Sequence, residues 1–235
     1  MFNTTGADTG PTLGVAPPEH ERELLERAQG LAGHTLGELA AHAGLATPTN
    51  SVRSKGWAGQ LIEALLGATA GSAPQPDFPA LGIELKTIPI NPNARPREST
   101  HVCVAPLIVE PGLTWVGSLV QRKLARVLWV PILWDGSTGP SDRIVCMPLC
   151  WSPSAQEQAV IRRDWEEHIE LIAMGRINEI TARQGEFLQV RPKAANARTT
   201  AWTTDHAGHR TPANPRGFYL RTRFTRHLLA AHFDP

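Results

Sequence analysis

The sequence predicts an α/β protein in which helices flank a mixed β-sheet, and three observations carry that prediction. Short apolar runs rich in β-branched residues lie between Gly and Pro turns, as strands do. Longer segments with apolar residues three and four apart begin at helix-capping residues. The two kinds of segment are interspersed along 235 residues, a length that can bury an ordinary core. Residues 83–88, 101–109, 127–133 and 144–149 are the expected strands of one mixed sheet.

Two short helices open the chain. The first begins at Pro18 and ends near Gly30, with four apolar residues on one face: Leu24, Leu25, Ala28 and Leu31. Thr35 with Glu38 forms a capping box, which starts the second helix. Such a pair also matches a DNA-reading helix-turn-helix, although packing is the commoner use.

The C-terminal half is predicted to hold one long helix and several short elements. Ser154 and Glu157 form a second capping box, and Gly175 marks the end of that helix. Its inner face carries Ile161, Trp165, Ile169 and Ile172, and its solvated face carries Glu166, Glu167 and Glu170. Residues 178–184 are expected to be helical, 187–190 to be a strand and 225–232 to be a terminal helix.

Composition sets broad limits on the class of protein. The three cysteines form neither a disulfide framework nor a zinc motif, which fits a reducing cytoplasm. No apolar run is long enough to span a bilayer, and no signal peptide is apparent, so we expect a cytoplasmic protein without a membrane partner. Residues 1–17, rich in Thr, Gly and Pro, are expected to be a disordered extension before a single domain at 18–235.

The most informative stretch runs from Asp77 to Lys86. Residues two apart on a strand share a face, so Glu84 and Lys86 point the same way, and the turn at Pro79 and Gly82 can bring Asp77 beside Glu84. Two adjacent carboxylates repel unless they share a proton or a divalent cation. Ligands that are all oxygen favour Mg²⁺ or Mn²⁺, and a lysine beside them can orient or activate water. The pattern indicates phosphodiester hydrolysis.

Commoner interpretations exist for each of these residues. An Asp, Glu and Lys at such spacing arise by chance, and a solvated strand edge with an ion pair is the ordinary outcome. Glu63 is the one charge in the apolar helix expected at 59–67. It could reach water at the edge of the helix, or it could face a nearby metal.

Basic residues suggest a phosphate-rich partner. Residues 190–235 carry eight Arg or Lys against two Asp, and Arg191 and Lys193 flank Pro192 just after the strand expected at 187–190. Arginine bound to guanine is the commonest specific contact in the major groove. The loop at 49–56 is also polar and basic, which suits a phosphate contact. His206 and His209 lack a third metal ligand and fit a solvated loop.

Six separate blocks, in order, resemble the MutH family, which is related to Sau3AI-type restriction enzymes. The blocks are KGWAGQ at 55–60, LGA at 66–68, PDF at 76–78, LGIELKTIP at 81–89, RVLWVP at 126–131 and RPKAAN at 191–196. The resemblance implies a restriction-endonuclease-like fold with two lobes around a DNA cleft. It also implies a monomeric Mg²⁺-dependent endonuclease of methyl-directed mismatch repair, which works with MutL and, indirectly, with MutS. Such an enzyme nicks the unmethylated strand of a hemimethylated GATC site, 5′ to the G.

The resemblance also assigns roles to residues of this chain. Asp77, Glu84, the carbonyl of Leu85 and Glu63 would hold the metal, Lys86 would act on the attacking water, and Lys123 would support full activity. The DNA-binding residues would be Lys55 and Gly56 at the backbone, Arg191 and Lys193 at bases or phosphate, and Tyr219 near the adenine amino group, where it senses a methyl group.

The chain departs from the family pattern at two positions, and two alternative functions remain. His101 stands where the family pattern leads us to expect an aromatic residue, and Val116 where an acid is usual, so DNA grip or partner response could differ. A GATC-specific restriction enzyme would cut both strands, but this chain has one catalytic motif and no internal repeat. A non-catalytic DNA-binding module is disfavoured by the presence of Asp77, Glu84 and Lys86 together.

Overall fold

The computed structural model describes residues 13–48, 56–193 and 201–233. The chain divides into two compact units. The first unit comprises Met1–Asn93 and Val127–Trp151, and the second comprises Ala94–Arg126 and Ser152–Pro235. Most of the predicted extension at 1–17 lies outside the described residues, but the carbonyl of Ala16 accepts a hydrogen bond of 2.7 Å from Arg27.

The first unit contains the predicted mixed sheet. β1 (Glu84–Ile90) runs parallel to β3 (Val127–Leu133), while β4 (Ile144–Val145) and β5 (Leu149–Trp151) pair antiparallel with β3. Every residue of β3 except the last is buried, as expected for a central strand covered on both faces. The strand predicted at 144–149 is therefore two short strands, separated at the segment that contains Pro148.

Three helices complete the core of the first unit. α1 (Glu21–Gly30) begins three residues after Pro18, because the side chain of His20 caps it by accepting from the Glu23 amide. α2 (Leu36–His42) begins at the predicted capping box of Thr35 and Glu38. The buried side chains of these helices join α3 (Trp57–Leu66), β1 and β3 in one hydrophobic cluster. This burial favours packing over a helix-turn-helix role.

The second unit has its own sheet. β2 (Thr100–Val104), β9 (Arg216–Leu220) and β6 (Leu188–Pro192) are all antiparallel, in the order β2-β9-β6. The prediction that residues 101–109 and 127–133 share one sheet is therefore wrong. The run at 101–109 is a strand only as far as Val104 and pairs with β9, a partner more than 100 residues away that local pattern cannot indicate.

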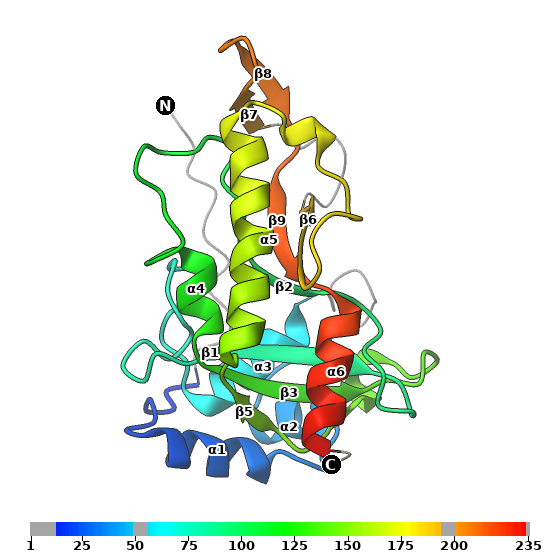
Figure 1. Ribbon diagram of the computed structural model, residues 1–235. Helices are drawn as coiled ribbons and strands as arrows, with labels where there is room; N and C mark the ends of the chain where they lie inside the picture. Colours follow the sequence, from blue (N-terminus) through cyan, green and yellow to red (C-terminus); the bar gives the residue numbers. More distant parts are fainter. Residues whose placement is uncertain (1–12, 49–55, 194–200, 234–235) are drawn as a thin grey trace, which may run out of the picture. The chain divides into compact units, whose positions relative to one another are not determined.

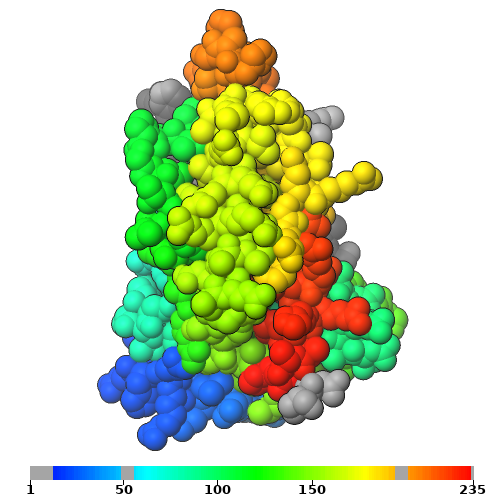
Figure 2. Space-filling view, viewed as in Figure 1, coloured from blue at the N-terminus to red at the C-terminus, as the bar shows by residue number. Residues whose placement is uncertain are grey.

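Three helices and a hairpin accompany this second sheet. α5 (Ala155–Ala173) begins at the predicted capping box of Ser154 and Glu157, lies along β6 and buries its predicted inner face (Figure 1). β7 (Ala201–Thr204) and β8 (Arg210–Ala213) form a hairpin whose tip is exposed (orange in Figure 2). α4 (Leu119–Leu124), which the sequence analysis missed, precedes β3, and α6 (Thr222–Phe233) contains the predicted terminal helix.

The segment between α5 and β6 differs from its prediction. Only the short 3₁₀ helix η2 (Ile177–Glu179) is helical there, and residues 181–184 are turns, which bring the chain to a left-handed glycine at Gly185. A second 3₁₀ helix, η1 (Pro140–Asp142), lies in the first unit. None of the described helices combines the length and apolar character that crossing a membrane would need.

Candidate functional site

A tight turn carries the candidate catalytic residues of the first unit. Phe78 and Ile83 exchange backbone hydrogen bonds of 2.9 and 3.3 Å, and Gly82 takes a left-handed φ of 67° that favours glycine. The chain thus folds back as the turn residues predicted. Asp77, only 8% exposed, accepts a hydrogen bond of 2.8 Å from the Leu85 amide through Oδ2. The turn therefore places this carboxylate against the start of β1.

Glu84 and Lys86 form an ion pair on β1. Lys86 Nζ donates to Glu84 Oε1, and the two side chains are 13% and 1% exposed. Their contact confirms that they share a face of the strand. Burial makes the pair strongly interdependent, because removing one partner leaves the other charge poorly solvated.

Glu63 lies on α3, which packs against β1. A Cβ added at Gly59 would lie 3.8 Å from Glu63 Oε1 and 3.9 Å from Thr87 Oγ1, so this carboxylate lies close to the contact between the helix and the strand. Throughout the described residues, no three His, Cys, Asp or Glu side chains gather as a group able to hold a metal ion. The participation of Glu63 in a metal shell stays a prediction.

The donor chemistry of the turn nevertheless fits a hard divalent cation. Asp77 and Glu84 are two buried carboxylates at the start of one strand, and Leu85 adds a carbonyl between Glu84 and Lys86. Oxygen donors without imidazole or thiolate favour Mg²⁺ or Mn²⁺. With fewer than three clustered acidic side chains, such a cation would keep several water ligands, as Mg²⁺ usually does.

The second unit gathers a different cluster around Tyr219 on β9. His101 on β2 lies directly opposite Tyr219, with the two rings 5.1 Å apart and edge to face. The guanidinium of Arg191 lies 5.8 Å from the centre of the Tyr219 ring, and its Nη1 donates 2.5 Å to Ser99 Oγ. We call Ser99, His101, Arg191 and Tyr219 the tyrosine cluster. It presents one cation and two aromatic rings on one sheet.

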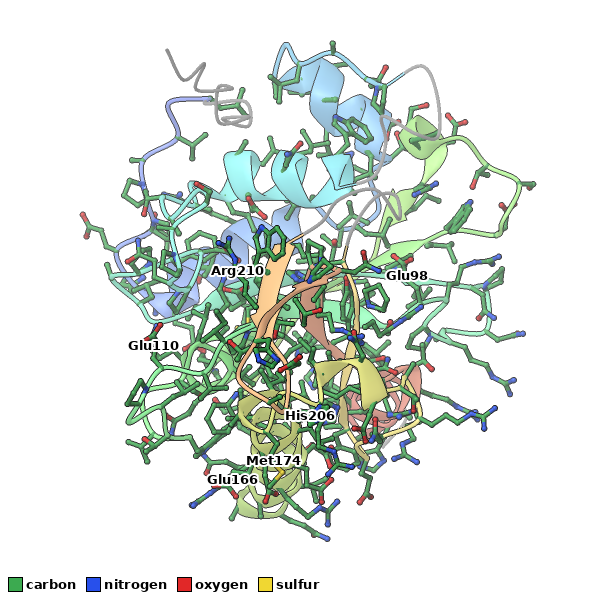
Figure 3. The ribbon with its side chains drawn as sticks, turned by 90° about the horizontal axis from the view of Figure 1, so that it is seen from above. Glu98, Glu110, Glu166, Met174, His206 and Arg210 are labelled. Atoms are coloured by element: carbon green, nitrogen blue, oxygen red, sulfur yellow. The ribbon has the colours of Figure 1, made fainter. Side chains whose placement is uncertain are left out.

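Gly217 makes room for this cluster. A Cβ at that position would lie 3.1 Å from Tyr219 Cε2 and 3.2 Å from His101 Cδ2, closer than side chains normally approach. Burial raises the pKa of Tyr219, while the nearby Arg191 lowers it and Glu98, labelled in Figure 3, raises it. The phenol therefore stays neutral near pH 7 and can donate a hydrogen bond.

The other predicted DNA-binding residues are more scattered. Arg191 lies within β6, opposite Gly217, and does not follow the strand as predicted. The predicted C-terminal end of the strand, Val190, was therefore two residues too early. Lys193 is exposed just beyond Pro192, and its amide donates to Pro215. Gly56 precedes α3 with φ 84°, and Lys55 lies outside the described residues. Lys123 is half-buried on α4 in the second unit.

Part of the basic C-terminal segment serves the fold instead of a partner. The side chains of Arg216, Arg221 and Arg223 donate to backbone carbonyls of residues 180–186. The charge count alone therefore overstated the cations available for phosphate. Conversely, Ser99, Gly217 and Asp164 carry no motif that marks them in the sequence; only the short Arg-Gly-Phe-Tyr stretch at 216–219 offered a signal near Gly217.

The first unit defines a class of protein. Buried carboxylates that suit a hard cation, paired with a strand lysine on a mixed sheet, are the apparatus of a metal-dependent phosphodiesterase.

Comparison with known proteins gives the family. A family model described as DNA mismatch repair enzyme MutH matches residues 66–164. A DNA mismatch repair protein MutH from Escherichia coli strain 536 is 54% identical over 219 residues, covering 93% of this chain and 96% of the relative. Its counterparts in Escherichia coli strains SE11 and 55989 are 53% identical with the same coverage. The chain belongs to the MutH family, which confirms the resemblance found in its sequence.

Proposed function

We propose that this protein is the Mg²⁺-dependent endonuclease of methyl-directed mismatch repair, which nicks the unmethylated strand of a hemimethylated GATC site 5′ to the G. The observation that carries the proposal is the pair of buried carboxylates, Asp77 and Glu84, with Lys86 bound to Glu84, in a chain that is 54% identical to a DNA mismatch repair protein MutH. The partners would be duplex DNA and MutL, with MutS acting indirectly.

The first unit supplies the cutting chemistry. Asp77, Glu84 and the Leu85 carbonyl would hold the metal, with Glu63 as the last protein ligand and water at the remaining positions. A bound Mg²⁺ would polarise the scissile phosphate and acidify a water molecule, and Mn²⁺ could substitute. Lys86, held against Glu84, would as an ammonium orient that water and stabilise negative charge developing on the phosphate; it could take the proton of the water only after losing its own. Lys123 is proposed as a further contributor to full activity.

The second unit supplies site choice. Arg191 would read a guanine edge, because two parallel N–H groups match its two acceptors. Lys193 would contact phosphate or a neighbouring base, and Lys55 and Gly56 would position the backbone from the first unit. Tyr219 would lie near the adenine amino group, where a methyl group adds bulk and removes a hydrogen bond.

Architecture and location complete the proposal. The two units would act as lobes around a DNA cleft in a restriction-endonuclease-like fold. One catalytic motif in a monomer would cut one strand, and the protein would work in the cytoplasm. A GATC-specific restriction enzyme that cuts both strands, and a DNA-binding module without activity, are the competing functions.

A plasmid assay separates these functions. Supercoiled DNA with GATC sites that are unmethylated, hemimethylated or fully methylated is incubated with the protein and increasing Mg²⁺, with and without MutL. Open circles from the unmethylated and hemimethylated substrates, and none from the fully methylated one, are expected. Linear DNA at the first cleavage event would indicate the restriction enzyme. A gel shift without any change of topology, with MutL present, would indicate the binding module.

A further inference from the structure

Asp164 is a buried carboxylate, 1% exposed, that the proposed chemistry does not use. Its Oδ2 accepts three consecutive backbone amides, from Glu186 at 2.8 Å, Phe187 at 2.6 Å and Leu188 at 2.9 Å. Successive amides that converge on one point form an anion-binding concavity, which this chain fills with its own side chain. Through Asp164, α5 is thereby hydrogen-bonded to the residues that lead into β6.

The same turn is held from its other side by two arginines. Arg221 donates to the carbonyls of Ala182 and Gln184 at 2.7 and 2.8 Å, and Arg223 donates to that of Glu186 at 2.6 Å. The amide of Arg221 also donates to the Phe187 carbonyl at 2.9 Å. We call Asp164, Arg221 and Arg223 with the turn at 182–188 the turn clamp. Arg221 follows β9 directly, so the clamp joins the ends of β6 and β9, two of the three strands that carry the tyrosine cluster.

The turn cannot easily relax into another shape. Gly185 has a left-handed φ of 80°, and a Cβ there would lie 1.8 Å from the Leu188 carbonyl oxygen. Only glycine fits this position. The clamp therefore fixes where β6 begins.

The start of β6 decides where Arg191 lies. Leu188, held by Asp164, pairs with Leu220, and three residues on Arg191 pairs with Gly217. In the described sheet β6 is an edge strand with β9 as its neighbour, so one side of the strand sets its register. A slip of one residue would turn every side chain to the opposite face. Arg191 would then leave Tyr219 and Ser99.

We infer that Asp164 is a positioning residue for site choice: by clamping residues 186–188 it holds β6 in the register that places Arg191 over Tyr219. This inference rests on the proposed function, because it assumes that Arg191 and Tyr219 read the DNA. Asp164 touches no substrate, so its removal should act on discrimination and leave the cutting groups of the first unit intact.

The test measures nicking of GATC duplexes against duplexes with one base changed, for the wild type and Asp164→Asn. The asparagine keeps the size and one acceptor but loses the charge that strengthens all three hydrogen bonds. Discrimination should fall about tenfold, the loss expected when one good base contact is misplaced. The nicking rate at saturating GATC DNA should stay within about threefold, since Lys86 is untouched. Hydrogen exchange at the backbone amides of residues 188–191 should accelerate.

Two controls isolate the clamp. Glu166→Gln changes an exposed carboxylate on the same helix (labelled in Figure 3) and should leave discrimination unchanged. Glu166 pairs with the exposed Arg162. Glu157→Ala weakens the capping box of α5 without touching the turn. If Glu157→Ala lowers discrimination as much as Asp164→Asn at equal thermal stability, the role of Asp164 is merely structural and the inference fails.

Further variants separate this failure from that of the proposed function. Arg223→Gln loosens the clamp from its exposed side and should lower discrimination in the same direction even if Asp164→Asn folds poorly. Arg191→Ala should abolish most site choice. If Arg191→Ala lowers discrimination and neither clamp variant does, the inference alone is overturned. If Arg191→Ala has no effect, the proposed reading role falls and the inference falls with it.

Discussion

The two units build their sites in opposite ways. In the first unit, Asp77, Glu84 and Lys86 lie within ten residues, and a single turn brings them together. In the second unit, Ser99 and Arg191 are 92 residues apart, and the tyrosine cluster depends on three strands in register. The proposed cutting groups are thus local, and the proposed reading groups are distant in sequence.

Burial differs in the same direction. Glu84 is 1% exposed, so water screens its interaction with Lys86 very little, and charges there act strongly on their neighbours. Arg191 is exposed, as a side chain that meets a DNA groove must be. The comparison implies that changes at the Asp77–Lys86 turn of the first unit alter the rate of cleavage, whereas changes in the tyrosine cluster of the second alter the choice of site.

The largest expected effect is that of Lys86→Ala. Losing a group that moves or orients a proton typically lowers a rate by about 10²–10⁴-fold. Nicking of a GATC plasmid in Mg²⁺ should fall by that factor, while retention of GATC DNA in a gel shift stays within about threefold of wild type. Single-turnover kinetics and a binding titration measure the two quantities.

A stability control accompanies this variant, because Glu84 would lose a buried partner. Breaking such a pair costs about 3–5 kcal/mol in other proteins. Lys86→Met keeps the apolar stem and should show the same loss of rate in a protein that unfolds at a temperature closer to wild type. A Lys86→Met protein that nicks at the wild-type rate would remove Lys86 from the chemistry and break the division between the units.

A smaller effect is expected from Gly217→Ala in the second unit. The added Cβ would lie 3.1 Å from the Tyr219 ring and 3.2 Å from both the His101 ring and the Cys103 carbonyl oxygen, so the two rings and β2 must shift by a few tenths of an ångström. The preference for nicking the unmethylated over the methylated strand should fall about three- to tenfold, which corresponds to a loss of roughly 1 kcal/mol in discrimination. The nicking rate on unmethylated DNA should change little.

Gly30→Ala is the matched control for that substitution. Gly30 ends α1 in the first unit, and nothing lies within 4 Å of an added Cβ. The variant should stabilise the protein by up to about 1 kcal/mol and keep full strand preference. If Gly217→Ala also keeps full preference, the position of the Tyr219 ring has no part in methyl sensing.

The same contrast explains how much the sequence predicted. The turn at Pro79 and Gly82, the two capping boxes and the inner face of α5 were predictable because each depends on residues a few positions apart. The side chains of Glu84 and Lys86 were expected on one face because residues two apart on a strand point the same way. All of these features depend on residues close together in the sequence, where turn, capping and periodicity rules apply.

Errors arose where distant segments meet. Strand partners were misassigned for 101–109, since its β9 partner lies beyond any local pattern. Asp164 was overlooked because an acid on a long helix is ordinarily solvated, and only the fold places three amides against it. Arg216, Arg221 and Arg223 were counted among the cations that suit a phosphate-rich partner, although their side chains donate to carbonyls of residues 180–186.

The smallest expected effect concerns pH and the turn clamp. His168 is 1% exposed, its Nδ1 lies 2.6 Å from the Asp164 carbonyl, and burial lowers its pKa from the ordinary value of 6.5. The unfolded chain therefore binds a proton more readily than the folded one. Stability is full above about pH 6.5 and falls as the pH drops below that value, because protonation then favours the unfolded state.

His168→Leu should remove this part of the acid sensitivity. Melting temperatures measured from pH 7.5 to 5.5 should fall less steeply for the variant than for wild type, by an amount on the order of a few degrees at the acid end. His206→Gln, at the exposed tip of the β7–β8 hairpin, should keep the wild-type slope. Equal slopes for wild type and His168→Leu would mean that the folded unit accommodates the proton beside the clamp. In that case acid would not loosen the turn clamp through His168, and the register of β6 would not depend on pH in this range.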